Sequence, residues 1–155
     1  MIPAAISEKI KIILSKYCGR EVNTTRDSPV GGGCINHAMK VEASSGNFFL
    51  KWNDAKRYPG MFEAEAKGLT LLKSVNAIRI PEVIGTSEVD GNSFIVLEFI
   101  ESGRREKNFW QDFGASLARL HKHTSDFFGL EHDNYIGSLP PEQLSEKNMG
   151  RIFYF

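Results

Sequence analysis

Consecutive glycines near the N-terminal third of the chain have the backbone freedom needed to hold a phosphate group. Gly31, Gly32 and Gly33 are followed by Cys34 and, two residues later, by Asn36. Glycine has no Cβ atom, so the backbone N–H groups of such a loop can approach an anion closely. The same residues could instead form a tight hairpin or a β-bulge, because glycine most often serves backbone geometry. The loop alone leaves both interpretations open.

A lysine and a glutamate downstream of this loop could complete a phosphate site. Lys51 lies in Phe48–Trp52, a run typical of a strand, on the face shared with Asn53. Glu65 lies within the apolar stripe of a predicted helix, among Met61, Phe62, Leu69 and Leu72. A carboxylate placed among apolar residues needs a partner, and Lys51 is the natural candidate.

A second glutamate of the same helix serves as an internal comparison. Glu63 falls on the opposite face and is followed four residues later by Lys67, so we expect an ordinary solvent-side ion pair. Only Glu65 therefore requires a special explanation. A strand lysine and a helix glutamate, both downstream of a glycine loop, form the arrangement with which kinases hold the phosphates of ATP. A purely structural ion pair is the alternative.

An apolar strand that runs into a glycine-containing connector is the third candidate feature. It spans Phe94–Gly103, with the sequence FIVLEFIESG. In a kinase-like fold this segment is the hinge, where backbone groups of Glu98, Phe99 and Ile100 would pair with the edge of adenine and apolar side chains would cover the ring. Without that context the run is simply a buried strand.

The elements that must position these residues follow from periodicity and turn signals. An N-terminal helix that ends at Cys18–Gly19 is predicted, because five apolar residues recur at helical spacing and should lie on the core: Ile6, Ile10, Ile13, Leu14 and Tyr17. Three antiparallel strands are predicted between 21 and 53, a helix over 61–75, two strands separated at Asp90–Gly91, and a helix over 108–124. We therefore predict an α+β fold: a five-stranded antiparallel sheet with one inserted helix, preceded by an N-terminal helix.

Composition narrows the classes of function. The 155 residues have 19 Lys plus Arg and 19 Asp plus Glu, so no net charge draws the chain to nucleic acid or to an anionic membrane. Charged residues interrupt the apolar N-terminal segment and argue against a signal peptide or a membrane span. The 2 cysteines are too few for a disulfide framework. We expect a cytoplasmic protein.

The motifs together resemble the fructosamine (ketosamine-3) kinase family. The likeness covers roughly 30–140 and rests on GGGCIN, FFLKWN, MFEAEAKGL, IPEVIG, LEFIESG, LARLHKHT and FFGLEHDNYIGSLP, in that order. The family belongs to the protein-kinase-like and aminoglycoside phosphotransferase-like superfamily. The resemblance implies transfer of the γ-phosphate of ATP to the sugar of a glycated amine or protein, a deglycation repair.

The resemblance also implies a division of the chain and roles for its residues. Residues 1–103 would form the ATP-binding N-lobe with a hinge at 97–103, and 104–155 would begin a truncated helical C-lobe. In the family's pattern the glycine loop with Cys34 and Asn36 would lie over the phosphates, Lys51 would contact them, and Glu65 would orient Lys51. Glu98, Phe99 and Ile100 would hold adenine.

The sequence departs from the family's pattern in its C-terminal part. Such kinases use an aspartate in a His-Gly-Asp type loop as catalytic residue and a further aspartate as ligand of magnesium. The last aspartate here is Asp133, inside the FGLEHDNYIG match. We therefore predict no catalytic or metal-binding residue in this chain, and magnesium use only together with a C-lobe. The alternatives are a non-catalytic nucleotide-binding or dimerisation module and the N-lobe of an aminoglycoside or choline phosphotransferase.

Two features suggest self-association. Cys34 lies among the loop amides, which would favour its thiolate, so we predict an oxidisable thiol that could bridge two chains; an inert apolar filler is the alternative. The terminal cluster Ile152, Phe153, Tyr154 and Phe155 could also join two chains if it is exposed.

Overall fold

The computed structural model describes residues 1–31, 35–125, 129–130 and 132–138. Their elements follow in the order α1 (Ala4–Cys18), β1 (Thr24–Pro29), β2 (His37–Ala43), β3 (Gly46–Asp54), α2 (Met61–Val75), β4 (Val83–Val89), β5 (Asn92–Glu98) and α3 (Phe109–His121). The predicted α+β class and the order of elements are confirmed. The last helix is shorter than the predicted 108–124.

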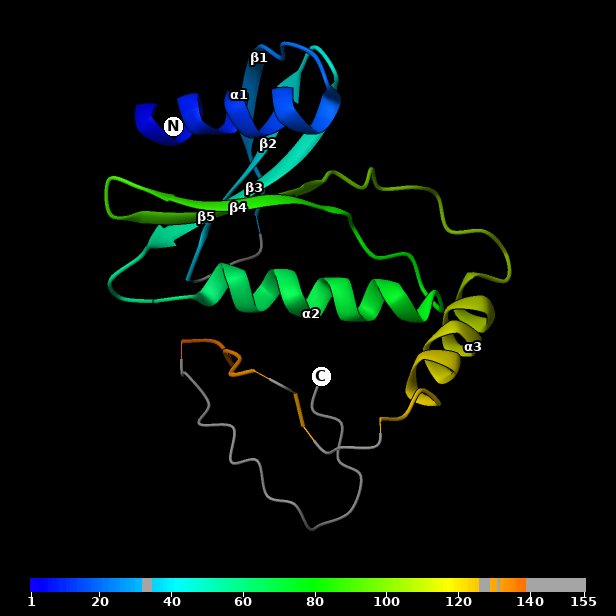
Figure 1. The fold of residues 1–155 in the computed structure, drawn as a ribbon. Helices are drawn as coiled ribbons and strands as arrows, with labels where there is room; N and C mark the ends of the chain where they lie inside the picture. The colour runs from blue at the N-terminus through cyan, green and yellow to red at the C-terminus, as the bar shows by residue number, and fades with distance from the viewer. Residues whose placement is uncertain (32–34, 126–128, 131, 139–155) are drawn as a thin grey trace.

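All five strands form one antiparallel sheet in the order β1-β2-β3-β5-β4. Strand β5 therefore lies between β3 and β4, and Ser93–Leu97 of this strand are all buried. Helix α1 lies on one side of the sheet and α2 on the other (Figure 1). Burial on both faces explains why β5 reads as an apolar run rather than an alternating pattern.

The turn between β4 and β5 is a two-residue hairpin. Asp90 and Gly91 have φ angles of 49° and 74°, and Val89 pairs with Asn92 across the turn. Positive φ at both central positions gives a backbone twist that matches the twist of the flanking strands, and Asp-Gly adopts it with little strain. The turn signal in the sequence is confirmed.

Helix α1 supplies the core on its side of the sheet. Ile6, Ile10 and Leu14 are buried against residues that include Leu50 and Phe94. The helix ends at Gly19, whose φ of 65° is the left-handed conformation of a helix C-terminus. The prediction that Tyr17 continues the buried stripe is wrong, because its side chain is 48% exposed. Partial burial and the neighbouring Glu82 carboxylate both disfavour the charged phenolate, so they raise the pKa of the Tyr17 hydroxyl group.

The second core cluster lies between the sheet and α2. Phe62 is fully buried against Ile95 and Leu97, with Phe49 and Val83 packed at the margin. The apolar stripe predicted for this helix thus faces the sheet at its N-terminal end. Helix α2 is held on the same face of β3 that carries Lys51.

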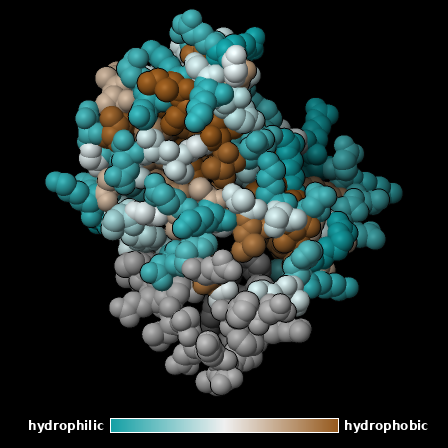
Figure 2. Space-filling view, in the orientation of Figure 1, coloured by the Kyte–Doolittle hydropathy of each residue, from teal (hydrophilic) through white to brown (hydrophobic). Residues whose placement is uncertain are grey.

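The visible surface is mostly hydrophilic, with hydrophobic surface gathered in a few places (Figure 2). Helix α3 exposes aromatic side chains, since Phe109, Trp110 and Phe113 are 37%, 66% and 40% exposed and lie within 6.4 Å of one another by ring centroid. Leu120 of the same helix is buried. In the described part of the chain, no helix is both long and apolar enough to cross a bilayer.

A polar junction ties the end of β5 to the segment before β4. The Glu98 carboxylate accepts a hydrogen bond of 2.7 Å from Arg79 and one of 3.3 Å from the backbone N–H of Glu82. The backbone N–H of Glu98 in turn donates to the carbonyl of Glu82 at 2.9 Å. The connector that follows β5 therefore starts from a fixed point.

We expect acid to weaken this junction. The hydrogen bond from Arg79, followed by that from the Glu82 backbone, lowers the pKa of Glu98. A carboxyl group with a lowered pKa stabilises the fold above its unfolded pKa, and this contribution is lost as the pH falls through the folded value. The free energy of unfolding should therefore decrease as the pH drops below 4.5, the ordinary pKa of glutamate. Glu98→Gln should make this decrease less steep. Urea unfolding at a series of pH values measures the slope.

Arg79→Met provides the matched control, since it removes the main partner and leaves the carboxyl group in place. It should reduce the steepness by less than Glu98→Gln does, because the Glu82 N–H still bonds to the carboxylate, and adding Arg79→Met to Glu98→Gln should reduce it no further. Equal steepness in the parent chain and in Glu98→Gln would contradict the assignment.

Two isoleucines of α1 offer a test of the core. Ile10 is 1% exposed and Ile12 is 63% exposed on the same helix. Ile10→Ala should lower the free energy of unfolding by about 2–5 kcal/mol, because it removes buried methyl groups and leaves a cavity. Ile12→Ala should change it by less than about 0.5 kcal/mol. Equilibrium urea unfolding compares the two, and similar losses for both would show that α1 is not seated as described.

Candidate functional site

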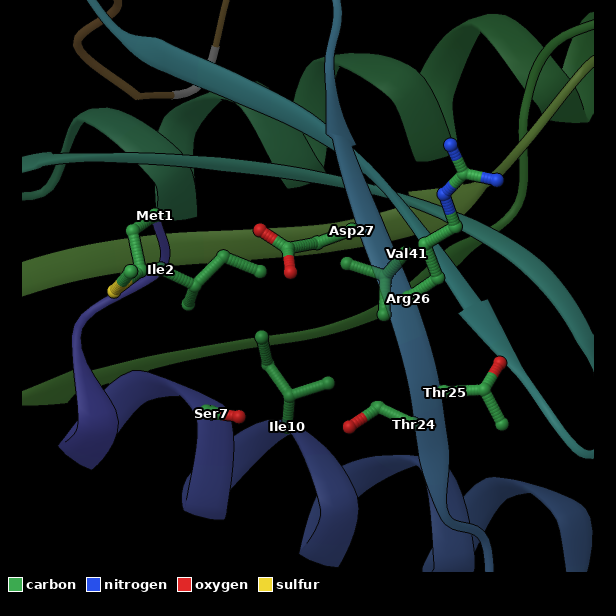
Figure 3. Close-up of a pocket in the computed structure, with 9 residues that line it drawn as sticks. All are labelled: Met1, Ile2, Ser7, Ile10, Thr24, Thr25, Arg26, Asp27 and Val41. Carbon is green, nitrogen blue, oxygen red and sulfur yellow. The ribbon is translucent and has the colours of Figure 1, made fainter.

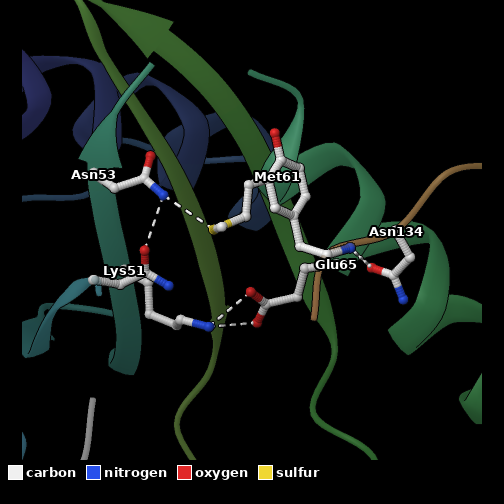
Figure 4. Close-up of polar contacts among 7 residues, drawn as sticks. Lys51, Asn53, Met61, Glu65 and Asn134 are labelled. Carbon is white, nitrogen blue, oxygen red and sulfur yellow. Dashed lines mark hydrogen bonds and ion pairs between the residues drawn. The ribbon is translucent and has the colours of Figure 1, made fainter. Parts of the chain in front are cut away.

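Lys51 and Glu65 form an ion pair between β3 and α2 in which the ammonium group contacts both carboxylate oxygens. Lys51 Nζ lies 2.9 Å from Glu65 Oε1 and 2.7 Å from Oε2 (Figure 4). The side chains are 22% and 27% exposed, so the pair is shielded but still reachable from solvent. Strand alternation places Lys51 on the α2 face, opposite Ala38 on β2 and Ile95 on β5. The partner expected for Glu65 is confirmed.

The comparison glutamate behaves differently from expectation. Glu63 is half-buried, and its Oε2 atom is shielded from solvent with no hydrogen-bond partner among the residues that the structure describes. No ion pair with Lys67 is formed in the described part of the chain. The prediction of a solvent-side pair is therefore wrong, because this flank of α2 is partly covered and helical spacing alone does not show what covers it.

The end of β1 and the start of β2 flank the glycine loop in the sequence, and β2 pairs with the strand of Lys51. The backbone N–H of Val30 donates to the carbonyl of Ala38 at 3.0 Å, so pairing of the two strands extends up to the loop. Ala38 lies directly opposite Lys51. Gly31 is exposed, with open space where a Cβ would be. Gly32, Gly33 and Cys34 lie outside the described residues, and so does the predicted thiol chemistry.

Asn36, at the far end of the loop, is joined to β3 and α2. Asn53 Nδ2 donates to Asn36 Oδ1 at 2.8 Å and to Met61 Sδ at 3.2 Å (Figure 4). Asn53 is 4% exposed and lies two residues after Lys51 on the same strand face. The loop end, the lysine strand and the glutamate helix are thus linked by one amide.

The connector after β5 lies beside an apolar surface of the sheet. The Phe99 and Phe49 rings are 6.5 Å apart, and Lys40 Nζ lies 4.7 Å from the centre of the Phe99 ring. Lys40 also pairs with Glu101 at 3.0 Å. Ile100 is 38% exposed. Glu98 directs its side chain to Arg79, and its N–H is bonded to Glu82, so both of these groups are already engaged.

A segment far along the chain meets the N-terminus of α2. The Tyr135 hydroxyl donates to the carbonyl of Pro59 at 2.9 Å, just before the helix begins. The Tyr135 N–H bonds to the side chain of Asn134 at 2.8 Å, and Figure 4 shows Asn134 on the side of Glu65 away from Lys51. The residues after α3 therefore brace the helix that carries Glu65.

A separate cavity lies on the other side of the sheet. It has a volume of about 150 Å³ and is lined by residues of α1 and β1, among them Ser7, Ile10, Thr24 and Asp27 (Figure 3). Cavities that hold drug-sized ligands are roughly 300–1,000 Å³. This hollow is too small for a nucleotide and does not adjoin Lys51.

The structure brings together Asn36, Lys51 and Glu65 and adds residues that the sequence did not single out. Asn53 was recognised only as sharing a strand face with Lys51, and Met61 only as part of an apolar stripe. Tyr135 carried no local signal, because its contact with Pro59 depends on how the chain returns. Among the described residues no group of His, Cys, Asp or Glu side chains could hold a metal ion. The assembled groups suit a polyanion: a cation fixed by a carboxylate, a loop end with an amide, and an apolar surface nearby.

Comparison with known proteins identifies the family to which this chain is similar. The fructosamine kinase family model matches residues 6–153. The match is longer than the 30–140 expected from the motifs, so it includes the N-terminal helix and most of the C-terminal tail. The family's likeness therefore does not end at Pro140.

Individual relatives agree. The chain is 41% identical over 125 residues to the chloroplastic protein-ribulosamine 3-kinase of Arabidopsis thaliana, covering 79% of this chain and 38% of that protein. The corresponding protein of Oryza sativa subsp. indica is 38% identical over 125 residues, with 79% and 36% covered. The chain thus spans about two-fifths of the length of these relatives.

Solved structures show the same fold. A protein assigned as a fructosamine-3-kinase from Haemophilus somnus 129PT superposes with a TM-score of 0.76 at 27% identity, over 88% of this chain and 45% of that one. A protein from Thermobifida fusca with the same assignment superposes with a TM-score of 0.69 at 27% identity, over 88% of this chain and 46% of that one. The kinase-like sheet and its inserted helix are shared. On the family match and the arrangement around Lys51, this chain belongs to the fructosamine kinase family.

Proposed function

We propose that these 155 residues are the ATP-binding part of a ketosamine kinase, an enzyme that phosphorylates the sugar of a glycated amine or protein. The observation that carries the proposal is the ion pair between Lys51 Nζ and both carboxylate oxygens of Glu65, at 2.9 and 2.7 Å. A lysine held in this way presents a fixed positive charge with a donor free for phosphate. Family membership supplies the substrate class.

The positions of the site residues suggest which of them bind the phosphates and which bind adenine. We assign the phosphates to the glycine loop with Asn36 and to Lys51, and adenine to the connector at Glu98, Phe99 and Ile100. Phe49 and Phe99 supply apolar surface for the ring, and the Glu98 carbonyl can accept a hydrogen bond from the base. This assignment treats 1–103 as the nucleotide-binding lobe with its hinge at 97–103, and 104–155 as the start of a helical lobe.

The remaining chemistry requires groups that the sequence does not contain. No aspartate follows Asp133, and no His-Gly-Asp sequence is present. A base near the sugar hydroxyl and ligands for magnesium would come from the part of the longer relatives that has no counterpart here. We therefore propose ATP binding as the property of these residues. From the cysteine count we propose the cytosol as their compartment.

Lys51→Ala tests the nucleotide site. Loss of the charged donor should weaken ATP binding by about 10- to 100-fold, since hydrogen bonds to charged groups contribute roughly 1.5–3 kcal/mol. Lys9→Ala, on an exposed position of α1, is the matched control and should leave affinity unchanged. Isothermal titration calorimetry with ATP, with and without magnesium, measures both. Equal affinity in the Lys51 variant and the parent chain would remove Lys51 from the site, and no binding by a folded parent chain would refute the proposal.

Turnover provides a second test. The purified chain should not phosphorylate a fructosyl-amine above the rate without protein, because the groups that position the nucleophile and neutralise developing charge are absent. Phosphorus-31 NMR or mass spectrometry of the sugar product measures the reaction. Phosphorylated product that disappears in Lys51→Ala would show that the chain is a complete catalyst.

A further inference from the structure

The side-chain amide of Asn53 uses both of its N–H groups. One donates to Asn36 Oδ1 at 2.8 Å and the other to Met61 Sδ at 3.2 Å. A thioether sulfur can only accept a hydrogen bond, so the group that faces Met61 must be the NH₂ end of the amide. Met61 therefore fixes the orientation of Asn53, and Asn53 fixes that of Asn36.

This order determines which end of Asn36 is available. Asn36 directs its oxygen to Asn53, so its own NH₂ group points away from that contact. No partner for the NH₂ group is found among the described residues, and the residue is half-exposed at the end of the glycine loop. An amide NH₂ is a donor, which an anion requires.

Burial of Asn53 is unfavourable for the stability of the fold. The residue is 4% exposed and pairs across the strands with Ser93. Asn53 Oδ1 and Ser93 Oγ are both shielded from solvent, and neither has a hydrogen-bond partner among the described residues. Buried polar groups without partners destabilise a fold, so each calls for an explanation. The explanation here is geometric, since this one side chain joins the end of the glycine loop to both β3 and α2.

We propose that Asn53 is a positioning residue that couples the end of the glycine loop to the first turn of α2 and turns the Asn36 NH₂ group toward the phosphates of the nucleotide. The inference rests on the proposed ATP site. Met61 and Glu65 are one helical turn apart on α2, and Lys51 and Asn53 share a strand face. Asn36 and the Lys51–Glu65 pair are therefore positioned as one unit.

Asn53→Leu tests this coupling, because leucine has similar volume and cannot donate. It should weaken ATP binding roughly fivefold or more, the effect of a lost hydrogen bond. Asn36→Ala should weaken binding similarly, and the double variant should be no weaker than the worse single variant, since both act through one contact. Ser93→Ala is the matched control, equally buried on the neighbouring strand, and should bind ATP as the parent chain does. Additive losses, or parent-like affinity of Asn53→Leu, would overturn the proposal.

Amide hydrogen exchange without nucleotide separates this proposal from the function of the site. In Asn53→Leu, exchange should become faster both at 35–38 and at 61–64, while Ser93→Ala changes neither segment. If the parent chain binds no ATP, the proposed function fails. Unchanged exchange at either segment overturns the coupling, whether or not ATP binds. If Asn53→Leu does not fold, Met61→Leu takes its place, because this volume-conserving change removes only the sulfur acceptor. It should speed exchange at 35–38, and unchanged exchange there would equally overturn the coupling.

Discussion

The alternation of side chains along β3 is the constraint on which the rest of the molecule depends. Leu50 and Trp52 point to the α1 side and are buried there, while Lys51 and Asn53 point to the α2 side. A shift of one residue in the pairing of β3 would exchange these two sets and place a lysine in the core. The hydrophobic core on one face therefore fixes where the charged group lies on the other, and the same strand serves stability and function.

Helix α2 is seated by polar contacts as well as by apolar packing. Phe62 anchors it on the sheet, Asn53 bonds to Met61 in its first turn, and Tyr135 bonds to the carbonyl of Pro59 before that turn. Gly60 precedes the helix and offers no side chain to cap it. These contacts stabilise an end that would otherwise fray, and they hold Glu65 at the distance at which both its oxygens reach Lys51.

The other end of the site is fixed independently. Glu98 and Arg79 anchor the start of the connector to the strand β4 side, and Lys40 with Glu101 ties its continuation to β2. The surface pairs contribute little to stability one by one, since they remain exposed to water. Their effect is to limit the positions that Phe99 and Ile100 can take. For the proposed ATP site this means that the ligand need not order the connector before its backbone groups meet adenine.

The sequence by itself determined the class of fold, the order of the elements and the identity of the central ion pair. These follow from local rules: Asp90–Gly91 specifies its turn, the apolar spacing of α1 and α2 specifies their buried faces, and a carboxylate within an apolar stripe needs a cation. Only the tertiary structure decided the exposure of Tyr17, the partly covered flank at Glu63, and the contacts of Asn53 with Asn36 and of Tyr135 with Pro59. The two contacts join residues that are 17 and 76 positions apart, and periodicity within one element contains no information about its distant neighbours.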